Sequence, residues 1–172
     1  MNKQDVVAVV LGGPSSEAEV SRRTGGAIAE ALREKGYNAV EVELVPEKLV
    51  EQLREIDAKV VFNAVHGMYG EDGRLQSILE AIKMPYTGSG VLASAVAMDK
   101  VATKRFLISA NISTPKCLMY NKRFDNDMAK IEKEIIATFG VPVVIKAADQ
   151  GSSIGVEIVK EEADVAAALE NT

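Results

Sequence analysis

Residues 5–13 read DVVAVVLGG, a β-branched run that ends at two glycines. Residues 6–11 are apolar at every position, so both faces of the strand are apolar. This is typical of a strand buried on both faces of a parallel sheet. A helical pattern follows, with Val20, Ile28 and Leu32 on one face, and Gly36 is placed to cap its carboxyl end. This stretch predicts the first strand and helix of an α/β fold.

The same alternation of strand and helix continues to about residue 87. The expected elements are strands at 38–44, 59–64 and 84–87, and helices at 46–56 and 75–82. This order implies right-handed crossovers, a mostly parallel sheet and helices on both faces. Because ligands of such folds bind beyond the carboxyl ends of the strands, the loops 12–19 and 66–73 are expected to meet in one cleft.

From about residue 96 the pattern indicates a small α+β lobe. Helices are expected at 98–110, 128–139 and 162–169, and strands at 116–120, 141–147 and 156–160. We place a domain boundary near residue 95, which gives a first domain of residues 1–95 and a second of residues 96–172. With no further strand to close its sheet, the second lobe is expected to be incomplete.

Composition excludes several classes of protein. The chain has 172 residues, 47% of them hydrophobic and 26% charged, and a net charge of -5, which provides no electrostatic footprint for nucleic acid. The amino terminus is interpreted as a strand rather than a signal peptide, and no apolar run has the length of a membrane span. The single cysteine, Cys117, excludes an internal disulfide, and the single histidine, His66, excludes HExxH zinc chemistry. A cytoplasmic protein with a small-molecule or protein partner is expected.

The turn Gly151-Ser152-Ser153-Ile154-Gly155 follows Lys146, which ends a predicted strand. Successive backbone N–H groups in such a turn can hold an oxyanion, and a lysine adds a charge suited to phosphate. An ordinary glycine-rich turn beside an exposed lysine is the alternative. Lys100 and Lys104 lie one helical turn apart, so they either hold an anion between them or form a solvated basic face.

Two loops of the first domain also carry candidate residues. Glu17 and Glu19 either complement the dipole of the following helix or receive a substrate ammonium group. His66 lies beyond a buried strand beside two acids, and a hydrogen-bonded loop histidine is the alternative. The stretch GSGVLA at 88–93 fits GxGxxA but follows the fourth predicted strand, so NAD binding is not expected, and no GxxxxGK[ST] occurs.

Several motifs, taken in order, resemble those of the D-alanine–D-alanine ligases of the ATP-grasp superfamily. They are LGGPSSEAEVS (11–21), NAVHGMYGEDGRLQSILE (63–80), MPYTGSGVLASAVAMDKVATK (84–104), ISTPKCL (112–118) and VPVVIKAADQGSSIGV (141–156). The resemblance covers nearly the whole chain, from Val6 to about Val159.

The resemblance implies a Rossmann-like pre-ATP-grasp substrate domain at 1–95 and the central ATP-grasp lobe at 96–172. It implies use of ATP and Mg²⁺ to phosphorylate one D-alanine, followed by attack of a second D-alanine on the acyl phosphate. The product, D-alanyl-D-alanine, serves peptidoglycan synthesis, and thereby cell wall biogenesis and cell shape. A cytoplasmic homodimer formed through the N-terminal domain is also implied, with no nucleic-acid or membrane partner.

Residue roles follow from the resemblance motif by motif. Lys100 and Lys146 match the two lysines that contact ATP phosphates, and Gly151 belongs to the same ATP-binding loop. Ser152 and Ser153 match the serine loop that closes over substrate and phosphate.

In the first domain, Glu17 matches the acid that binds the amino group of the first D-alanine, and His66 matches a histidine of that cleft. Of these residues, Glu17 and Ser152 are the candidate catalytic residues. Ala147 stands where the family usually has proline, and this departure is expected to loosen the strand end slightly.

Family members are about twice as long as this chain. The remaining half would supply the Mg²⁺ ligands, the adenine pocket and the second D-alanine site, because carboxylates placed to meet a phosphate-bound Mg²⁺ are not recognisable here. We therefore expect these 172 residues alone to be inactive and to bind no metal. A D-alanine–D-lactate or other dipeptide ligase, and a non-catalytic binding or assembly fragment, are the alternatives.

Overall fold

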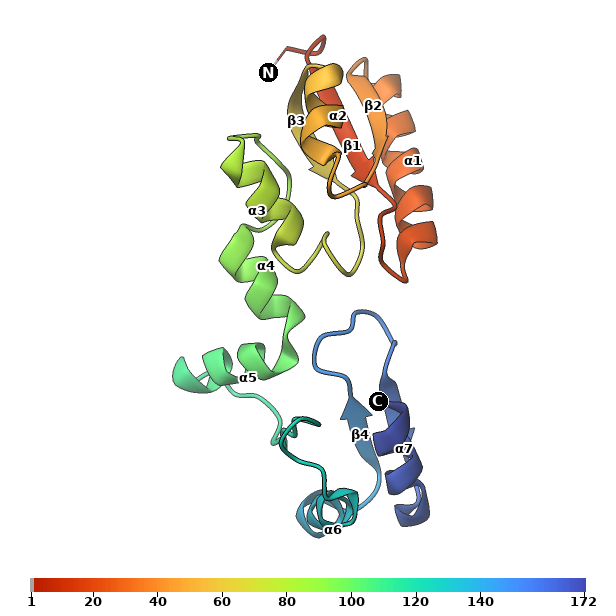
Figure 1. Ribbon diagram of the computed structural model, residues 1–172, viewed down its shortest axis with the longest axis vertical. Coiled ribbons are helices and arrows are strands. Elements are labelled where there is room, and N and C mark those ends of the chain that lie inside the picture. The colour runs from red at the N-terminus through yellow and green to blue at the C-terminus, as the bar shows by residue number, and fades with distance from the viewer. Residues whose placement is uncertain (1) are drawn as a thin grey trace. The chain divides into compact units, whose positions relative to one another are not determined.

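The computed structural model describes residues 2–172. The chain divides into two compact units, Met1–Met98 and Asp99–Thr172 (Figure 1). The first unit contains a parallel sheet and the second contains an antiparallel hairpin. No helix within residues 2–172 combines the length and the apolar character needed to cross a bilayer.

The first unit is built on a three-stranded parallel sheet in the order β2-β1-β3. The strands are β1 (Val6–Leu11), β2 (Asn38–Glu43) and β3 (Ala58–Asn63). β1 lies in the centre, and its residues 7–11 are buried because helices cover both faces of the sheet. The predicted α/β fold with a parallel sheet is therefore confirmed.

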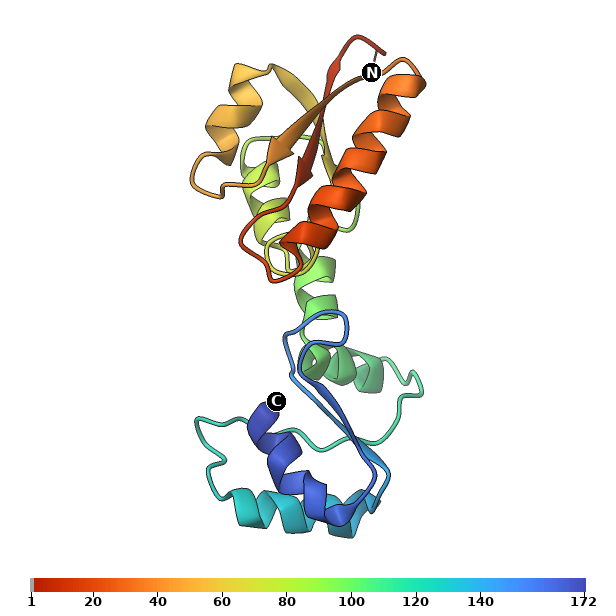
Figure 2. The same cartoon turned by 90° about the vertical axis from the view of Figure 1, so that its right-hand side faces the viewer.

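Four helices accompany this sheet: α1 (Ala18–Glu34), α2 (Leu49–Glu55), α3 (Arg74–Ala81) and α4 (Val91–Met98). Figure 2 shows α1 (orange) on one side of the sheet and α2 (gold) on the other. Val9 belongs to the core cluster on the α1 side, whereas Val10 belongs to the cluster formed with α2 and α3. This is the result of the two-residue period of a strand.

The carboxyl end of α1 confirms the predicted glycine cap. Gly36 has a φ of +80°, a conformation that glycine adopts without the strain other residues experience. Its N–H donates to the Arg33 carbonyl (2.9 Å), and the Tyr37 N–H donates to the Leu32 carbonyl (3.0 Å). This pair of bonds is a Schellman motif, and it turns the chain from α1 into β2.

The prediction of a fourth strand at 84–87 is wrong, because only an isolated parallel bridge between Val61 and Tyr86 forms there. The Val61 N–H donates to the Pro85 carbonyl (2.8 Å), and the Thr87 N–H donates to the Val61 carbonyl (3.1 Å). Pro85 has no N–H to continue the ladder, and Gly88, with a φ of +106°, redirects the chain.

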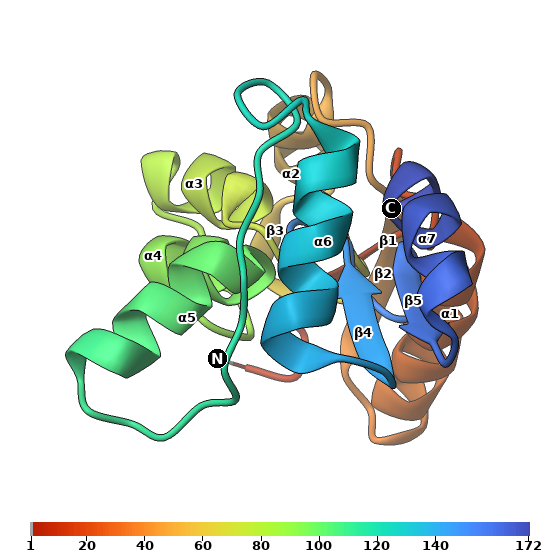
Figure 3. The ribbon, with the colours of Figure 1, turned by 90° about the horizontal axis from the view of Figure 1, so that it is seen from below.

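The second unit contains α5 (Lys100–Ser109), α6 (Met128–Phe139), β4 (Val143–Lys146), β5 (Val156–Val159), a 3-10 turn (Glu162–Asp164) and α7 (Val165–Asn171). β4 and β5 pair antiparallel, and α6 and α7 lie beside them (Figure 3). The core consists of Ile131, Ile135, Val159, Val165 and Ala168. The other face of the hairpin is open, because the cross-strand neighbours Val144 and Ile158 are 48% and 67% exposed.

Two expectations for this unit need correction. Residues 116–120 form no strand: Leu118 and Tyr120 pack against the core of the unit, but the segment joins no ladder. Residues 117–120 are all partly buried, so the apolar run there reflects packing rather than strand pairing. The helix expected from Met98 begins at Lys100, because Asp99 accepts hydrogen bonds from the N–H groups of Val101 and Ala102 and caps it.

Candidate functional site

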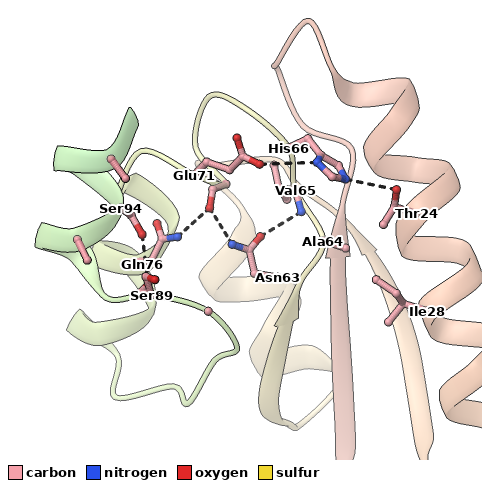
Figure 4. Close-up of a pocket in the computed structure, with 14 residues that line it drawn as sticks. Thr24, Ile28, Asn63, Ala64, Val65, His66, Glu71, Gln76, Ser89 and Ser94 are labelled. Atoms are coloured by element: carbon pink, nitrogen blue, oxygen red, sulfur yellow. Dashed lines mark hydrogen bonds and ion pairs between the residues drawn. The ribbon is translucent and has the colours of Figure 1, made fainter. Parts of the chain in front are cut away.

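A pocket of about 370 Å³ lies in the first unit, beyond the carboxyl end of β3 (Figure 4). Its lining comes from α1, β3, α3, α4 and the loops between them: Thr24, Ile28, Asn63, Ala64, Val65, His66, Gly70, Glu71, Gln76, Gly88, Ser89, Ala93, Ser94 and Ala97. This is the edge of a parallel sheet at which ligands bind in α/β folds.

His66 lies in the wall of this pocket. Its Nε2 is 3.3 Å from the Thr24 hydroxyl, and its Nδ1 is 3.7 Å from a carboxylate oxygen of Glu71. The ring is one-third exposed, so a ligand in the pocket can reach it. The role of His66 in substrate binding remains a prediction.

Glu17 does not line the pocket but lies beside the loop that carries His66. A Cβ added to Gly67 would lie 2.7 Å from both Glu17 Oε2 and Ser15 Oγ, so the backbone at Gly67 packs closely against these two side chains. Gly67 has a φ of +67°, which also favours glycine. The structure therefore brings together the two loops expected to share a cleft.

Ser21 holds these loops together, a function that the sequence reasoning missed. Its buried hydroxyl accepts the Gly12 N–H (2.8 Å) and donates to the Ala64 carbonyl (2.7 Å). It thus joins the ends of β1 and β3 through the first turns of α1. A serine on the inward face of an otherwise apolar helix pattern is the signal that could have identified it, because a buried hydroxyl requires partners.

The second unit carries the other predicted site residues. Lys146 ends β4 with an exposed side chain, and no ion pair or hydrogen bond holds its ammonium group within the described chain. Ser152 and Ser153 also make no hydrogen bond in the described structure, and Ser152 has a φ of +52°. Unpaired donors in a tight turn are available for an anionic ligand.

Lys100 contacts the same loop. Its backbone N–H donates to the Ala148 carbonyl (2.9 Å), and its ammonium group donates to the Gln150 carbonyl (2.6 Å). Lys104 instead donates to the Pro115 carbonyl, so the two lysines do not hold one anion between them. The structure brings Lys100, but not Lys104, to the serine loop.

Ala147 does not loosen the end of β4, contrary to expectation. Its N–H donates to the Gly155 carbonyl (2.7 Å), which extends the pairing of β4 and β5 by one bond to the base of the serine loop. A proline at this position has no N–H and would not form this bond. The departure from the family pattern therefore adds a bond to the base of this loop.

Metal binding is not assigned to any residue. Within residues 2–172, no group of three or more His, Cys, Asp and Glu side chains is placed to hold a metal ion. Mg²⁺ prefers several oxygen ligands in octahedral geometry, and the described side chains do not present such a set.

Comparison with known families shows two matches. The family model "D-ala D-ala ligase N-terminus" matches residues 43–89, and "D-ala D-ala ligase C-terminus" matches residues 106–172. The D-alanine–D-alanine ligase of Moorella thermoacetica is 46% identical over 164 residues, which cover 95% of this chain and 53% of that protein. The enzyme of Pelotomaculum thermopropionicum is 45% identical over 166 residues, covering 95% and 52%.

Solved structures agree with these matches. The D-alanine–D-alanine ligase of Bacillus anthracis superposes with a TM-score of 0.82 at 35% identity, covering 96% of this chain and 53% of that chain. The same protein complexed with ATP superposes with a TM-score of 0.74 at 33% identity, covering 96% and 54%. The VanG D-Ala:D-Ser ligase of Enterococcus faecalis has a TM-score of 0.75 at 28% identity, covering 97% and 59%.

The chain spans about half the length of the curated relatives it matches. Its mixed α/β fold, parallel sheet and partial ATP-grasp lobe are those of the matched ligase structures. The chain belongs to the D-alanine–D-alanine ligase family of the ATP-grasp superfamily, and it corresponds to the N-terminal and central portion of the proteins in that family.

Proposed function

We propose that the chain is the portion of an ATP-dependent ligase that binds the first D-alanine and the ATP phosphates. The full reaction joins two D-alanines to D-alanyl-D-alanine for peptidoglycan, through an acyl phosphate. The observation that carries the proposal is the donor set of Lys146, Ser152 and Ser153, whose side chains have no partner in the described part of the chain. The chain matches D-alanine–D-alanine ligases over nearly its whole length. Because this reaction uses ATP, we assign it to the cytoplasm.

In the second unit we propose that the lysines neutralise phosphate charge. Lys146 is a free point charge at the end of β4, and Lys100 can exchange the Gln150 carbonyl for a phosphate oxygen. The loop at Gly151, Ser152 and Ser153 supplies N–H and hydroxyl donors. Stabilising negative charge on transferring phosphoryl oxygens is the main task of a protein in such a reaction.

The open face of the β4–β5 hairpin supports nucleotide binding at the same place. Val144 and Ile158 form an exposed apolar pair across the two strands, and Lys146 projects from the same face two residues after Val144. An apolar surface beside a lysine suits a ligand with a flat aromatic ring and an anionic tail. We propose that this face contacts the nucleobase.

In the first unit we propose that Glu17 accepts the ammonium group of the first D-alanine and that His66 lines the same cleft. Both lie where the loops after β1 and β3 come into contact, at Gly67. A carboxylate beside a tight glycine turn is well suited to a small zwitterion, because a charge-assisted hydrogen bond orients the amine. Mg²⁺ would accompany ATP, and we assign its ligation to no residue of this chain.

The homodimer is proposed to form through the first unit. α4 has the sequence VLASAVAM and is apolar at every position except Ser94, yet Leu92 is 71% exposed and Ser94 is the one buried residue of the helix. An apolar helix that remains exposed is a common feature of an interaction surface.

A second candidate function is a ligase that joins D-alanine to a different second substrate. The similarity to the VanG D-Ala:D-Ser ligase, at 28% identity, favours keeping this alternative. A D-alanine–D-lactate or other dipeptide ligase falls in the same class. A non-catalytic binding or assembly role for the 172 residues is a third proposal, and the activity of a longer protein with this sequence separates it from the others.

The test is D-alanine-dependent release of phosphate from ATP and Mg²⁺. Because the curated relatives are about twice as long, we propose that the 172 residues alone release none, whereas a full-length ligase containing them does. Replacing the second D-alanine by D-serine or D-lactate identifies the second substrate. Absence of D-alanine-dependent release by the full-length protein would contradict the proposed function.

A further inference from the structure

Gln76 is a buried polar residue in the wall of the pocket. It is 3% exposed and is one of the three buried residues of α3, with Leu75 and Leu79. Its Nε2 donates to the Gly70 carbonyl (2.7 Å), whereas its Oε1 is buried without a hydrogen-bond partner among the described residues. The amide is therefore only half satisfied.

A half-satisfied buried amide is unfavourable for folding. The unpaired oxygen has lost its hydration without gaining a partner, and this disfavours the folded state. Methionine at this position would have nearly the same length, would suit a buried position of α3, and would leave no orphaned oxygen. The glutamine contributes a hydrogen bond to the Gly70 carbonyl that methionine cannot make. We therefore look for the role of Gln76 in the backbone segment that this hydrogen bond restrains.

The Gly70 carbonyl receives a second hydrogen bond from Asn63 Nδ2 (2.8 Å), and Asn63 Oδ1 accepts the Val65 N–H (3.0 Å) (Figure 4). One asparagine thus ties both ends of the segment 65–70. The segment is also closed on itself, because a Cβ added to Gly70 would lie 2.1 Å from the Val65 carbonyl oxygen. The two amides hold a backbone arrangement that only glycine permits at position 70.

The two restrained backbone groups, the Val65 N–H and the Gly70 carbonyl, lie next to residues that line the pocket. His66 follows Val65, and Glu71 follows Gly70. Fixing these two backbone positions sets the distance between the His66 ring and the Glu71 carboxylate, which is 3.7 Å. The other ring nitrogen reaches Thr24 on α1 at 3.3 Å.

We propose that Gln76, together with Asn63, is a positioning residue for His66 and Glu71. It acts by holding the Gly70 carbonyl, at the expense of an unpaired buried oxygen. The functional consequence rests on the proposed function, in which His66 lines the site of the first D-alanine. The positioning itself does not depend on that assignment.

The test is Gln76→Met in the 172-residue chain, followed by NMR of the imidazole. His66 is the only histidine, so its ring signals are assigned without ambiguity. We expect these signals to shift or broaden while the melting temperature stays unchanged or rises. We also expect the dissociation constant for D-alanine to increase about fivefold to tenfold, the loss expected for one hydrogen bond in a positioning network.

Gln52→Met is the matched control, because Gln52 is another half-satisfied amide. Its Nε2 donates to the Glu43 carbonyl (3.2 Å), its Oε1 is buried and unpaired, and it lies on α2 outside the pocket. We expect no change in the His66 signals of this variant. A change as large as that of Gln76→Met would overturn the proposal, since the effect would then be general to the fold.

Asn63→Asp provides an independent variant in case Gln76→Met does not fold. The aspartate still accepts the Val65 N–H but cannot donate to Gly70, so the His66 signals should move again. Unchanged His66 signals in the folded variants would overturn the positioning role. If the signals move in the variants but D-alanine does not perturb His66 in the unmodified chain, the positioning stands and the proposed substrate site fails.

Discussion

The two loops that carry the predicted site residues are held in different ways. In the loop 65–73 of the first unit, side chains hold the backbone: Asn63 and Gln76 bind the Gly70 carbonyl, and Asp72 accepts the N–H groups of Tyr69 and Arg74. In the loop 148–154 of the second unit, the serine side chains have no partner among residues 2–172, and external bonds come from Lys100 and from the Ala147–Gly155 pair at its base.

The difference indicates two functions for similar glycine-rich sequences. A loop fixed by buried side chains presents preorganised groups to a small ligand, which lowers the entropy lost on binding. A loop with unpaired donors and few restraints can close over a larger ligand and open to release it. We infer that the first loop orients the amino acid and that the second loop responds to phosphate.

The largest effect is expected for Gly70→Ala in the first loop. The new Cβ would meet the Val65 carbonyl, so the backbone must shift, and the free energy of unfolding should fall by about 2–3 kcal/mol. Urea unfolding followed by circular dichroism measures it. Gly26→Ala is the control, because a Cβ at Gly26 on α1 meets nothing within 4 Å, and the better helix propensity should stabilise the chain by about 1 kcal/mol. Equal stabilities of the two variants would contradict the tight closure of this loop.

Lys146→Ala tests the proposed contact between the lysine beside the second loop and the phosphates of ATP. In a full-length ligase we expect the KM for ATP to rise about 10-fold to 100-fold and kcat to fall, because a charged phosphate contact worth about 1.5–3 kcal/mol is lost. Steady-state phosphate release at varied ATP measures this change. Lys160→Ala removes another exposed lysine just after β5 and should leave both constants unchanged. Unchanged kinetics for Lys146→Ala would refute its assignment.

Ala147→Pro tests whether the hydrogen bond between Ala147 and Gly155 restrains the base of the second loop. The variant removes the N–H that donates to Gly155, so one hydrogen bond worth about 1 kcal/mol is lost. We expect amide exchange at the end of the hairpin to become about fivefold faster by NMR. Ala147→Ser keeps the N–H and should exchange at the original rate. An unaltered rate in Ala147→Pro would show that this bond does not restrain the loop.

The smallest effect is expected at Glu43, which accepts the Gly13 N–H (3.2 Å) and pairs with Arg22 (2.8 Å). The hydrogen bond from Arg22 lowers the pKa of Glu43 below its usual value. The pair therefore stabilises the fold above about pH 4.3, the usual glutamate value, and this contribution is lost as the pH falls through the lower native pKa.

Glu43→Gln should accordingly lower the melting temperature slightly at pH 7, and the difference from the unmodified chain should vanish at acidic pH. Both side chains are nearly half exposed, so the effect is small and decreases with added salt. Glu41→Gln is the control: it breaks the neighbouring pair with Arg33 (3.1 Å) but leaves the bond from Gly13 to Glu43 in place. If Glu43→Gln destabilised the chain equally at pH 7 and at acidic pH, the ion pair would not be the cause.

Most elements were predictable because their local patterns agree with their final environment. The buried run at 6–11, the amphipathic helices and the glycine cap at Gly36 each follow from residue spacing alone. The strands expected at 84–87 and 116–120 did not form, because a short apolar segment indicates burial and does not show that a neighbouring strand is available to pair with it.

The candidate residues could be named from motifs, whereas their partners could not. Glu17, His66, Lys146 and the serine loop stand in recognisable stretches of sequence. The contact of Gly67 with Glu17, the bridge made by Ser21 and the hold of Gln76 on Gly70 join residues that no local pattern relates.

Residue order alone established the strand and helix periods, the glycines that permit tight turns, and the family to which the motifs belong, since these depend on neighbours along the chain. Tertiary structure decided which buried polar groups find partners and which loops are restrained. Among the described residues, Ser21 is satisfied by two backbone groups, Gln76 is half satisfied, and Ser152 has no hydrogen-bond partner. Hydrogen-bond partners are set by distances in the folded chain, and positions far apart in sequence acquire those distances only on folding.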